Sequence, residues 1–199
     1  MTTPMSWDDA YTGGTPAPWD IDRPQHAFAR LAERGLLSGQ LLDAGCGTGE
    51  NTLLAAVAGA DAVGVDLAPH AIERARAKAA DRGVTARFEV GDLLDLGWLG
   101  RTFDTVIDSG VFHVFDDENR GRYVASLASV LPPGGTVYLL CFSDRQPGDF
   151  GPRRIRQEEL RDAFSHGWSI ESVEADTFDV NRDFGMAAAQ AWRAAIQRK

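Results

Sequence analysis

The sequence predicts an α/β fold built on one doubly wound, mostly parallel sheet with helices on both faces. Short apolar runs alternate with helix-period stretches from about residue 40 to about residue 143. A glycine-rich turn at 43–49 directly follows the first of these runs. Strands spaced by helices of this length form a parallel sheet with right-handed crossovers. The 199 residues fit a single domain, 1–199, with N-terminal cap helices over 1–36 and the core over 37–199.

Each apolar run is expected to be a strand. The five parallel strands are predicted at 40–44, 62–66, 86–90, 103–108 and 136–142. The helices between them are predicted at 50–58, 69–82 and 118–130. Pro69 at a helix start and Gly83 just past its end are the usual punctuation of a helix. Residues 132–135, Pro-Pro-Gly-Gly, form a turn that leads into the fifth strand.

The segments outside this alternation are predicted from local composition. Residues 144–154 contain two prolines and two glycines among charges, which favours a mobile loop beside the ligand site. A short helix is expected at 158–164 and a strand at 169–180, whereas the alanines of 187–196 favour a helix. Apolar spacing around residues 28–36 predicts an N-terminal helix, and 6–11 a second short one, both capping the sheet edge.

Composition limits the partners that this chain can have. A net charge of −9 and a pI near 4.9 argue against tight nucleic-acid binding, which needs clustered Lys and Arg, and favour a small-molecule partner. No run of 18 uncharged apolar residues is present, so we expect no membrane partner and a cytoplasmic protein. Cys46 and Cys141 lack metal-type spacing, so no metal is expected. A monomer and a homodimer are both compatible with the sequence.

The turn Asp43-Ala44-Gly45-Cys46-Gly47-Thr48-Gly49 is the most informative motif. Glycines at alternate positions let the backbone turn sharply after a strand and approach a ligand closely. A dinucleotide-binding turn would have its third glycine at position 50, where this chain has Glu50. The departure argues against NAD, and so against a nicotinamide-dependent oxidoreductase.

Carboxylates end three of the predicted strands. Asp43 ends the first, Asp66 ends the second 23 positions later, and Asp92 follows the third. In a doubly wound sheet the ligand lies outside the carboxyl ends of the strands, and an acidic residue at the spacing of Asp66 can accept both ribose hydroxyls. An Asp at a strand end often only caps the next helix or turn. Together, the three positions favour a nucleoside-containing ligand.

Residues 40–142 resemble the class I S-adenosylmethionine (SAM)-dependent methyltransferases. The residues that carry the resemblance are the first motif at 43–49, Asp66 and Asp92, the fourth-strand motif at 104–108, and the turn at 131–136. Residues 14–20, Pro24-Gln25 and 108–113 resemble small bacterial methyltransferases of the thiopurine-methyltransferase-like group, whose members methylate hydroxyquinolones and other heterocyclic or phenolic toxins. The resemblance implies a seven-stranded Rossmann-like sheet in which 187–196 is an antiparallel last strand. In this group a Ser or Thr usually caps the helix that starts near position 156; Arg156 and Gln157 stand here, which leaves the start of that helix open.

The resemblance also implies SAM as cofactor and assigns roles to the site residues. Asp43 accepts from the SAM ammonium, Asp66 from the ribose, and Asp92 from the adenine amino group, while Trp19 closes over the methionine end. The full predicted cofactor set is Trp19, Asp43, Gly45, Gly47, Gly49, Asp66, Leu67, Asp92, Leu93 and Ser109. Asp20 is expected either to orient a base or to pair with Arg23.

Methyl transfer is an in-line displacement on an activated donor, so the protein mainly aligns the acceptor and excludes water. An oxygen acceptor must still lose a proton, and His113 is the leading candidate for its base; the alternative is that His113 caps a helix or orders a loop. A flat acceptor calls for an aromatic pocket. The expected pocket residues are Trp7, Tyr11, Phe112, His113, Phe142 and Phe150, although some of them are expected to be ordinary core.

The expected function is therefore SAM-dependent methyl transfer to an O or N atom of a small aromatic or heterocyclic acceptor. Arg153, Arg154 and Arg156 either attract an anionic acceptor or form a solvated charge run. Thiol or halide methylation is an alternative within the same class. A nicotinamide-dependent oxidoreductase and a non-catalytic SAM-binding regulator are the alternatives outside it.

Overall fold

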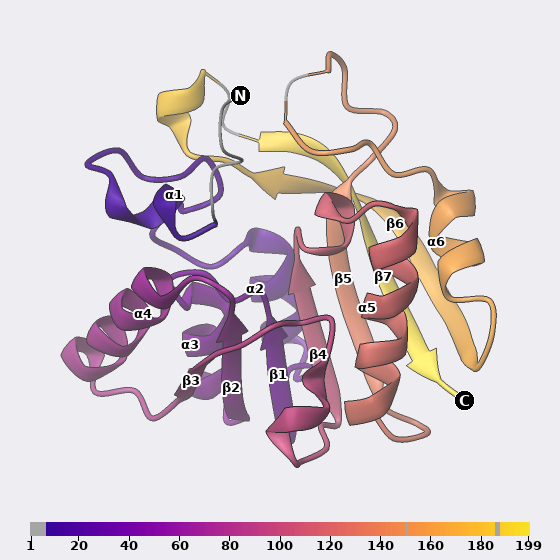
Figure 1. Ribbon diagram of the computed structural model, residues 1–199, viewed down its shortest axis with the longest axis horizontal. Coiled ribbons are helices and arrows are strands. Elements are labelled where there is room, and N and C mark those ends of the chain that lie inside the picture. The colour runs from indigo at the N-terminus through magenta and orange to yellow at the C-terminus, as the bar shows by residue number, and fades with distance from the viewer. Residues whose placement is uncertain (1–6, 150, 186–187) are drawn as a thin grey trace.

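A seven-stranded sheet forms the centre of the chain, in the order β3-β2-β1-β4-β5-β7-β6 (Figure 1). The computed structural model describes residues 7–149, 151–185 and 188–199. The strands are β1 (Gln40–Ala44), β2 (Asp61–Asp66), β3 (Arg87–Val90), β4 (Thr105–Ser109), β5 (Thr136–Phe142), β6 (Trp168–Asp179) and β7 (Ala188–Arg198). β1 to β5 pair in parallel, whereas β7 pairs antiparallel with both β5 and β6. The predicted doubly wound, mostly parallel sheet is confirmed.

The alanine-rich segment is a strand, as the resemblance implied and its composition did not. Residues 188–198 form β7, and residue 187 lies outside the described residues. Ala191 pairs with Phe142 on one side and Asp176 on the other, so β7 is enclosed between two strands. Buried and less buried residues alternate along much of it. Tertiary pairing therefore overrides the helix preference of alanine.

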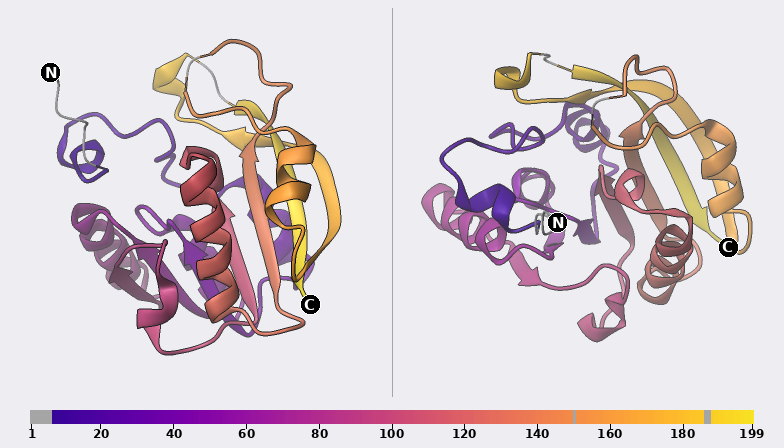
Figure 2. Two further views of the ribbon diagram at one scale, coloured as in Figure 1. Left: turned by 45° about the vertical axis from the view of Figure 1, so that its right-hand side comes forward. Right: turned by 45° about the horizontal axis from the view of Figure 1, so that its top comes forward.

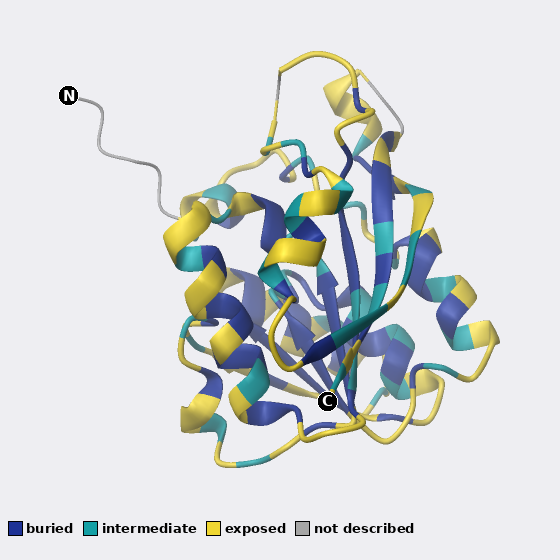
Figure 3. Cartoon of the chain, turned by 90° about the vertical axis from the view of Figure 1, so that its right-hand side faces the viewer, coloured by how far each residue is buried: buried dark blue, intermediate teal, exposed yellow. Residues whose placement is uncertain are grey.

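Helices cover both faces of the sheet. They are α1 (Asp9–Thr12), α2 (His26–Glu33), α3 (Glu50–Val57), α4 (Pro69–Arg82), α5 (Asp117–Val130) and α6 (Gln157–Ala163), with short 3₁₀ turns η1 (Leu96–Leu99), η2 (Phe112–Val114) and η3 (Arg182–Phe184). Successive strand residues face opposite sides: Leu42 packs with α5 and α6, and Leu41 with α2 and α3. Figure 3 shows buried residues along the strands and exposed residues on the outer sides of the helices.

The N-terminal helices do not act together as a cap. Phe28 and Leu31 of α2 are fully buried against the sheet face, in one cluster with Leu41 and Ile107. α2 is thus part of the helix layer, and only α1 and the chain around it lie above the carboxyl ends of the strands (Figure 2). None of the helices in the described part of the chain has the length and apolar character needed to cross a membrane.

The start of α6 shows how a helix begins without the usual Ser or Thr cap. Arg156 precedes the helix in an extended conformation, and the Glu159 carboxylate accepts a hydrogen bond from the Arg156 backbone N–H at 3.0 Å. This is the reciprocal half of a capping box. The helix therefore begins at Gln157, one residue earlier than the sequence predicts.

Candidate active site

A cavity of about 870 Å³ opens at the carboxyl ends of the parallel strands. Its walls come from α1 and the chain on both sides of it, the ends of β1 to β5, loop residues 146–149 and 151–154, and the end of β6. Figure 1 shows these segments gathered above the same edge of the sheet. The predicted residues that line it are Trp7, Tyr11, Trp19, Gly45, Asp66, Leu67, Asp92, Leu93, Ser109, His113 and Phe142. The structure thus brings most of the predicted site residues to one cavity.

Gly45 is the point where the glycine turn meets this cavity. Its φ is +75°, and a Cβ on it would lie 2.1 Å from a methyl carbon of Val111. Gly47 donates its N–H to Asp66 at 2.8 Å and lies beside the Tyr11 hydroxyl. Gly45 is therefore the predicted turn glycine that lines the cavity, and Gly47 lies just behind it.

Gly49 has a different task from the one predicted. It takes a left-handed conformation at the start of α3, and a Cβ on it would lie 2.8 Å from both Ala75 and Phe88. Gly49 does not line the cavity, so the prediction that it contacts the cofactor is wrong. Its lack of a side chain instead allows α3 to pack closely on α4 and β3. The next residue, Glu50, is buried and accepts from Lys78 and Arg82 at 2.8 Å each. The Glu50 side chain is thus fixed by ion pairs with Lys78 and Arg82.

Asp66 lies where β2 reaches the cavity. Its two oxygens accept hydrogen bonds from the backbone N–H groups of Gly47 at 2.8 Å and Ala68 at 2.9 Å. Burial raises the pKa of this carboxyl, and these backbone donors oppose the rise. The carboxylate therefore joins the glycine turn to the start of α4 and keeps lone pairs that face the cavity.

Asp43 lies behind the cavity wall and does not line it. It is fully buried, one of its oxygens accepts from the Thr52 hydroxyl at 2.6 Å, and the other has no partner among the described residues. Burial raises its pKa to about 7. An unpaired buried acceptor beside Gly45 fits the cationic ammonium of an amino-acid tail, which supports SAM as the ligand of this turn.

The adenine-side residues lie at the ends of β3 and β4. Asp92 is exposed in the cavity, and one of its oxygens accepts from the Leu94 N–H at 2.9 Å. Leu67 and Leu93 supply apolar wall, and Ser109 lines the cavity at the end of β4. This arrangement leaves the second oxygen of Asp92 available to a ligand amino group.

Aromatic side chains form the N-terminal wall. The Trp19 indole N–H donates to the Tyr11 hydroxyl at 2.8 Å, and Trp7 packs edge-on against Trp19 with ring centroids 5.8 Å apart. Asp20 does not pair with Arg23: it accepts from the Thr48 hydroxyl at 2.8 Å and lies 3.0 Å from the Arg74 guanidinium. Asp20 therefore ties this wall to the glycine turn.

His113 lines the cavity, but its geometry does not suit a base. Its Nδ1 accepts a hydrogen bond from the Phe142 backbone N–H at 3.0 Å. Burial, with a smaller contribution from the nearby Arg154 charge, lowers its pKa to about 3. The ring is therefore neutral near pH 7, with its one proton on Nε2. The expectation that His113 accepts a proton is corrected: it presents an N–H donor.

Asp108 holds the backbone turn that carries His113. This buried carboxylate accepts from the backbone N–H groups of Val111 at 2.7 Å and Phe112 at 3.1 Å, and from the Tyr123 hydroxyl at 3.0 Å. These bonds fix the turn into η2. Burial raises the pKa of Asp108 to about 7.

Three rings surround the inner end of the cavity. Phe142 lies edge-on to His113 with centroids 5.1 Å apart, and Phe178 lies 5.8 Å from His113 and 5.3 Å from Phe142. Phe112, predicted to line the pocket, is fully buried on the other side of η2, stacked on Phe164 at 5.9 Å. The next position in the chain, His113, faces the cavity instead. Phe150 lies outside the described residues.

Several cavity residues escaped the sequence analysis. Phe178, Val180 and Phe184 come from the end of β6 and the turn after it. β5 and β6 both pair antiparallel with β7, so β6 runs parallel to β5 and ends at the same edge of the sheet. No local motif signals this pairing. Arg153 and Arg154 line the cavity, which is compatible with the predicted attraction of an anionic acceptor. Arg156 lies outside the cavity and contacts Glu159.

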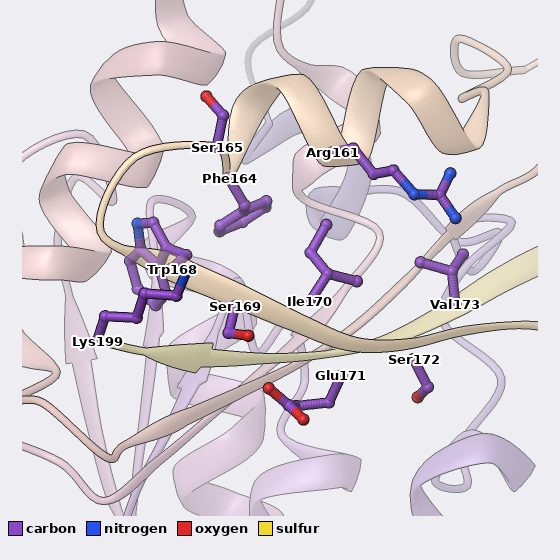
Figure 4. A pocket seen from close by; sticks show the side chains of 10 residues that line it. All are labelled: Arg161, Phe164, Ser165, Trp168, Ser169, Ile170, Glu171, Ser172, Val173 and Lys199. Carbon is purple, nitrogen blue, oxygen red and sulfur yellow. The ribbon is translucent and has the colours of Figure 1, made fainter.

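A second hollow, of about 490 Å³, lies between α6 and β6. Figure 4 shows Ile170 and Val173 of β6 pointing toward α6, which carries Arg161. None of the predicted site residues lines it. In the part of the chain that the structure describes, no three His, Cys, Asp or Glu side chains are grouped to hold a metal ion.

The raised pKa values of Asp43 and Asp108 predict how stability depends on pH. A carboxyl whose pKa is about 7 when folded and about 3.8 when unfolded holds more protons in the folded state. Its stabilising contribution is complete below pH 3.8 and is lost as pH rises through 7. His113, whose pKa is lowered, acts oppositely, but only below its ordinary value of 6.5. Chemical unfolding of the ligand-free protein should therefore show stability falling between pH 6.5 and 8, by on the order of 1 kcal/mol.

The variant Asp43→Asn should flatten this fall, because one of the two buried carboxyls no longer titrates. Asp61→Asn is the matched control, since the pKa of the exposed Asp61 is lowered by its hydrogen bonds to Arg87 and Arg101 and it stays ionised throughout this window. An Asp43→Asn profile as steep as that of the unmodified protein would contradict the assignment.

The fold and the cavity together define a class of protein. A doubly wound sheet with an antiparallel β7 inserted between β5 and β6 carries a glycine turn and strand-end carboxylates for a nucleoside with an amino-acid tail. An aromatic chamber adjoins them. These are the features of a class I methyltransferase.

Comparison with known proteins gives the same result. Residues 41–135 match the family described as a methyltransferase domain. The 2-heptyl-1-hydroxyquinolin-4(1H)-one methyltransferase of Mycobacteroides abscessus is 36% identical over 187 residues, covering 89% of this chain and 82% of that protein. A structure solved for the conversion of a disulfide bond into a thioacetal group during echinomycin biosynthesis has a TM-score of 0.86 and 37% identity, over 96% of this chain and 89% of that one. A SAM-dependent methyltransferase from Anabaena variabilis shares the fold, with a TM-score of 0.78 and 20% identity over 97% of this chain and 92% of that one.

This chain belongs to the SAM-dependent methyltransferases. The family follows from the Mycobacteroides relative, whose identity and coverage extend over most of both chains. The predicted enzyme class and SAM as the methyl donor are confirmed. The nicotinamide-dependent alternative is set aside.

Proposed function

We propose that this enzyme transfers the methyl group of SAM to an O or N atom of a small, flat aromatic or heterocyclic acceptor. The observation that carries the proposal is the chamber formed by His113, Phe142 and Phe178, whose rings lie 5.1–5.8 Å apart and adjoin the strand ends that bind SAM. Three rings in such an arrangement match the faces and edges of a planar ligand. The relative that acts on a hydroxyquinolone supports the same acceptor class.

The chain's own residues align the reactants and exclude water. SAM supplies an activated methyl group when bound. Gly45, Asp66 and Asp92 hold its amino-acid and nucleoside parts, and Trp19 with Tyr11 covers one side. The rings around His113 hold the acceptor in a mostly apolar space, which raises the effective concentration of the two reactants. We further propose that no nucleic acid or membrane takes part, and that the enzyme acts as a monomer or homodimer in the cytoplasm.

Transfer of a labelled methyl group from SAM tests the proposal. Purified protein is incubated with hydroxyquinolones, phenols, flavonoids, thiols and halide ions, and each acceptor is omitted in turn as a blank. We expect turnover with hydroxylated heterocycles, and Phe178→Ala should lower it by about 10-fold or more by opening one wall of the chamber. Transfer to thiols or halides alone would reject the proposed acceptor class.

A further inference from the structure

We propose that the acceptor enters this site already ionised, and that His113 selects it by donating a hydrogen bond to its anionic oxygen. The inference rests on the proposed methyl transfer. It narrows the substrates to flat aromatic compounds with an acidic hydroxyl group, such as a phenol or an N-hydroxy heterocycle that ionises near neutral pH. An alcohol or a weakly acidic phenol of the same shape is then a poor substrate.

The hydrogen-bond donor is defined by the backbone. A neutral imidazole carries one proton, and Nδ1 of His113 is occupied as the acceptor of the Phe142 N–H at 3.0 Å. The proton therefore lies on Nε2. That atom is 3.1 Å from the point where a Cβ on Gly110, a cavity-lining residue, would stand. No partner for Nε2 is found within residues 7–149, 151–185 and 188–199. A ligand oxygen is the natural acceptor for this N–H.

Among the described residues, no carboxylate of the cavity is held beside this donor. The titratable residues of the cavity are Tyr11, Asp66, Asp92, His113, Asp149, Arg153 and Arg154. β2 and β3, which end at or just before Asp66 and Asp92, lie two and three strands from β4, and Gly110 beside Nε2 follows β4; at about 4.8 Å per strand this is about 10 Å or more. Proton transfer needs contact within about 3.2 Å, or one bridging water. Asp149 is exposed in the 146–154 loop. The described carboxylates are thus either distant from this N–H or on an exposed loop, so we expect the acceptor's proton to leave to solvent before binding.

Positive charge at the same end favours an anion. The Arg154 guanidinium lies 5.4 Å from the centroid of the Phe142 ring, and its positive charge contributes to the lowered pKa of His113. It is held there by the carbonyls of Gln146, Pro152 and Gly148. A cation and an N–H donor that both face a low-dielectric chamber bind an aryl oxyanion more tightly than the neutral aryl hydroxyl.

The step balances without a base. A lone pair of the acceptor oxyanion forms the O–CH₃ bond, and the S–CH₃ bond breaks with its electron pair going to sulfur. The anion and the sulfonium cation both become neutral, giving a methyl ether and a thioether. The hydroxyl proton has already gone to solvent, so none needs a place in the chamber.

The test uses 4-nitrophenol, whose anion and neutral form absorb at different wavelengths. Its pKa is measured by absorbance, free and bound to the enzyme with S-adenosylhomocysteine, so no turnover is needed. We expect the bound pKa to fall by about one unit, a tenfold preference for the anion. His113→Gln, which keeps an N–H donor, should retain most of the shift, whereas His113→Ala and Arg154→Met should each lose several-fold of the preference. Arg122→Met, on the exposed face of α5, is the control and should bind as the unmodified enzyme does.

Steady-state kinetics give the second readout. With ring-substituted phenols of similar size, kcat/KM should rise with pH and reach its midpoint at the pKa of each free acceptor. One midpoint shared by all acceptors and abolished in His113→Gln would overturn the inference, as would a bound pKa equal to or above the free one. If no acceptor is methylated, the proposed function fails, and the absorbance titration still decides whether the site takes an aryl anion.

Discussion

Replacement of Gly49 by alanine is expected to lower the free energy of unfolding by about 2–5 kcal/mol. Gly49 has φ +88°, a conformation that costs an alanine about 1–2 kcal/mol. The new Cβ would also lie 2.8 Å from the Cβ of Ala75 and 2.8 Å from a ring carbon of Phe88. Both neighbours lie in a buried cluster, so relief requires α3 to move from α4, at a further cost of about 1–3 kcal/mol. Chemical unfolding measures the sum.

Gly59→Ala is the matched control for this prediction. Gly59 has φ +101°, and a Cβ on it would meet no atom within 4 Å. This variant carries the backbone strain without the clash, and should lose only the strain of about 1–2 kcal/mol. Equal losses in the two variants would show that the glycine at position 49 is needed for its backbone conformation alone, and would reject the packing argument.

The parallel half of the fold could be predicted because most of its strands have a short, buried apolar run at their centre. β1 and β5 were predicted at their observed bounds, and β2 differs from its prediction only by including Asp61. A strand that is buried on both faces appears in the sequence as a short apolar run, and an amphipathic helix is recognised by the helical period of its apolar residues. The start of α5 also carries a local signal: the Asp116 side chain accepts from the Asn119 N–H at 2.8 Å.

The antiparallel half could not be predicted from composition. β7 contains alanine at positions where a free-standing segment would favour a helix, and its strand conformation depends on pairing with β5 and β6, which are distant in sequence or formed just before it. The resemblance to a family supplied what the composition lacked. The same long-range pairing brings Phe178 to His113, 65 positions earlier in the chain.

The chemistry of His113 shows the limit of motif-based assignment. The sequence predicted this histidine near the acceptor, and in the structure it lines the cavity. Whether a histidine accepts or donates a proton depends on the partner of its other nitrogen. That partner is a backbone N–H on β5, 29 residues away, and a sequence motif around His113 cannot indicate it. Residue identity predicted the place, and only the fold reveals the hydrogen-bonding role.

Replacement of Asp66 by alanine is expected to weaken SAM binding by about 1.5–3 kcal/mol, the scale of hydrogen bonds to a charged group. Asp66 lines the cavity at the end of β2, and its remaining lone pairs are available to the ribose hydroxyls that it is predicted to bind. The same carboxylate accepts from Gly47 and Ala68, so the variant also leaves two backbone donors without their acceptor and loosens the glycine turn. Calorimetric titration with SAM measures the affinity, and chemical unfolding reports the accompanying loss of stability.

Two comparisons separate ribose binding from bracing of the turn. Asp104→Ala removes a carboxylate that accepts from the Gln40 N–H at 2.8 Å, at the opposite end of the sheet, and should leave SAM affinity unchanged. The 2′-deoxy analogue of S-adenosylhomocysteine lacks a hydroxyl that Asp66 is expected to bind, so the unmodified enzyme should bind it more weakly than the parent ligand. Asp66→Ala should bind the two ligands nearly alike, because variant and analogue remove one and the same interaction and their effects cannot add. Additive effects would show that Asp66 acts on SAM only through the glycine turn, and unchanged affinity for SAM would remove it from the site.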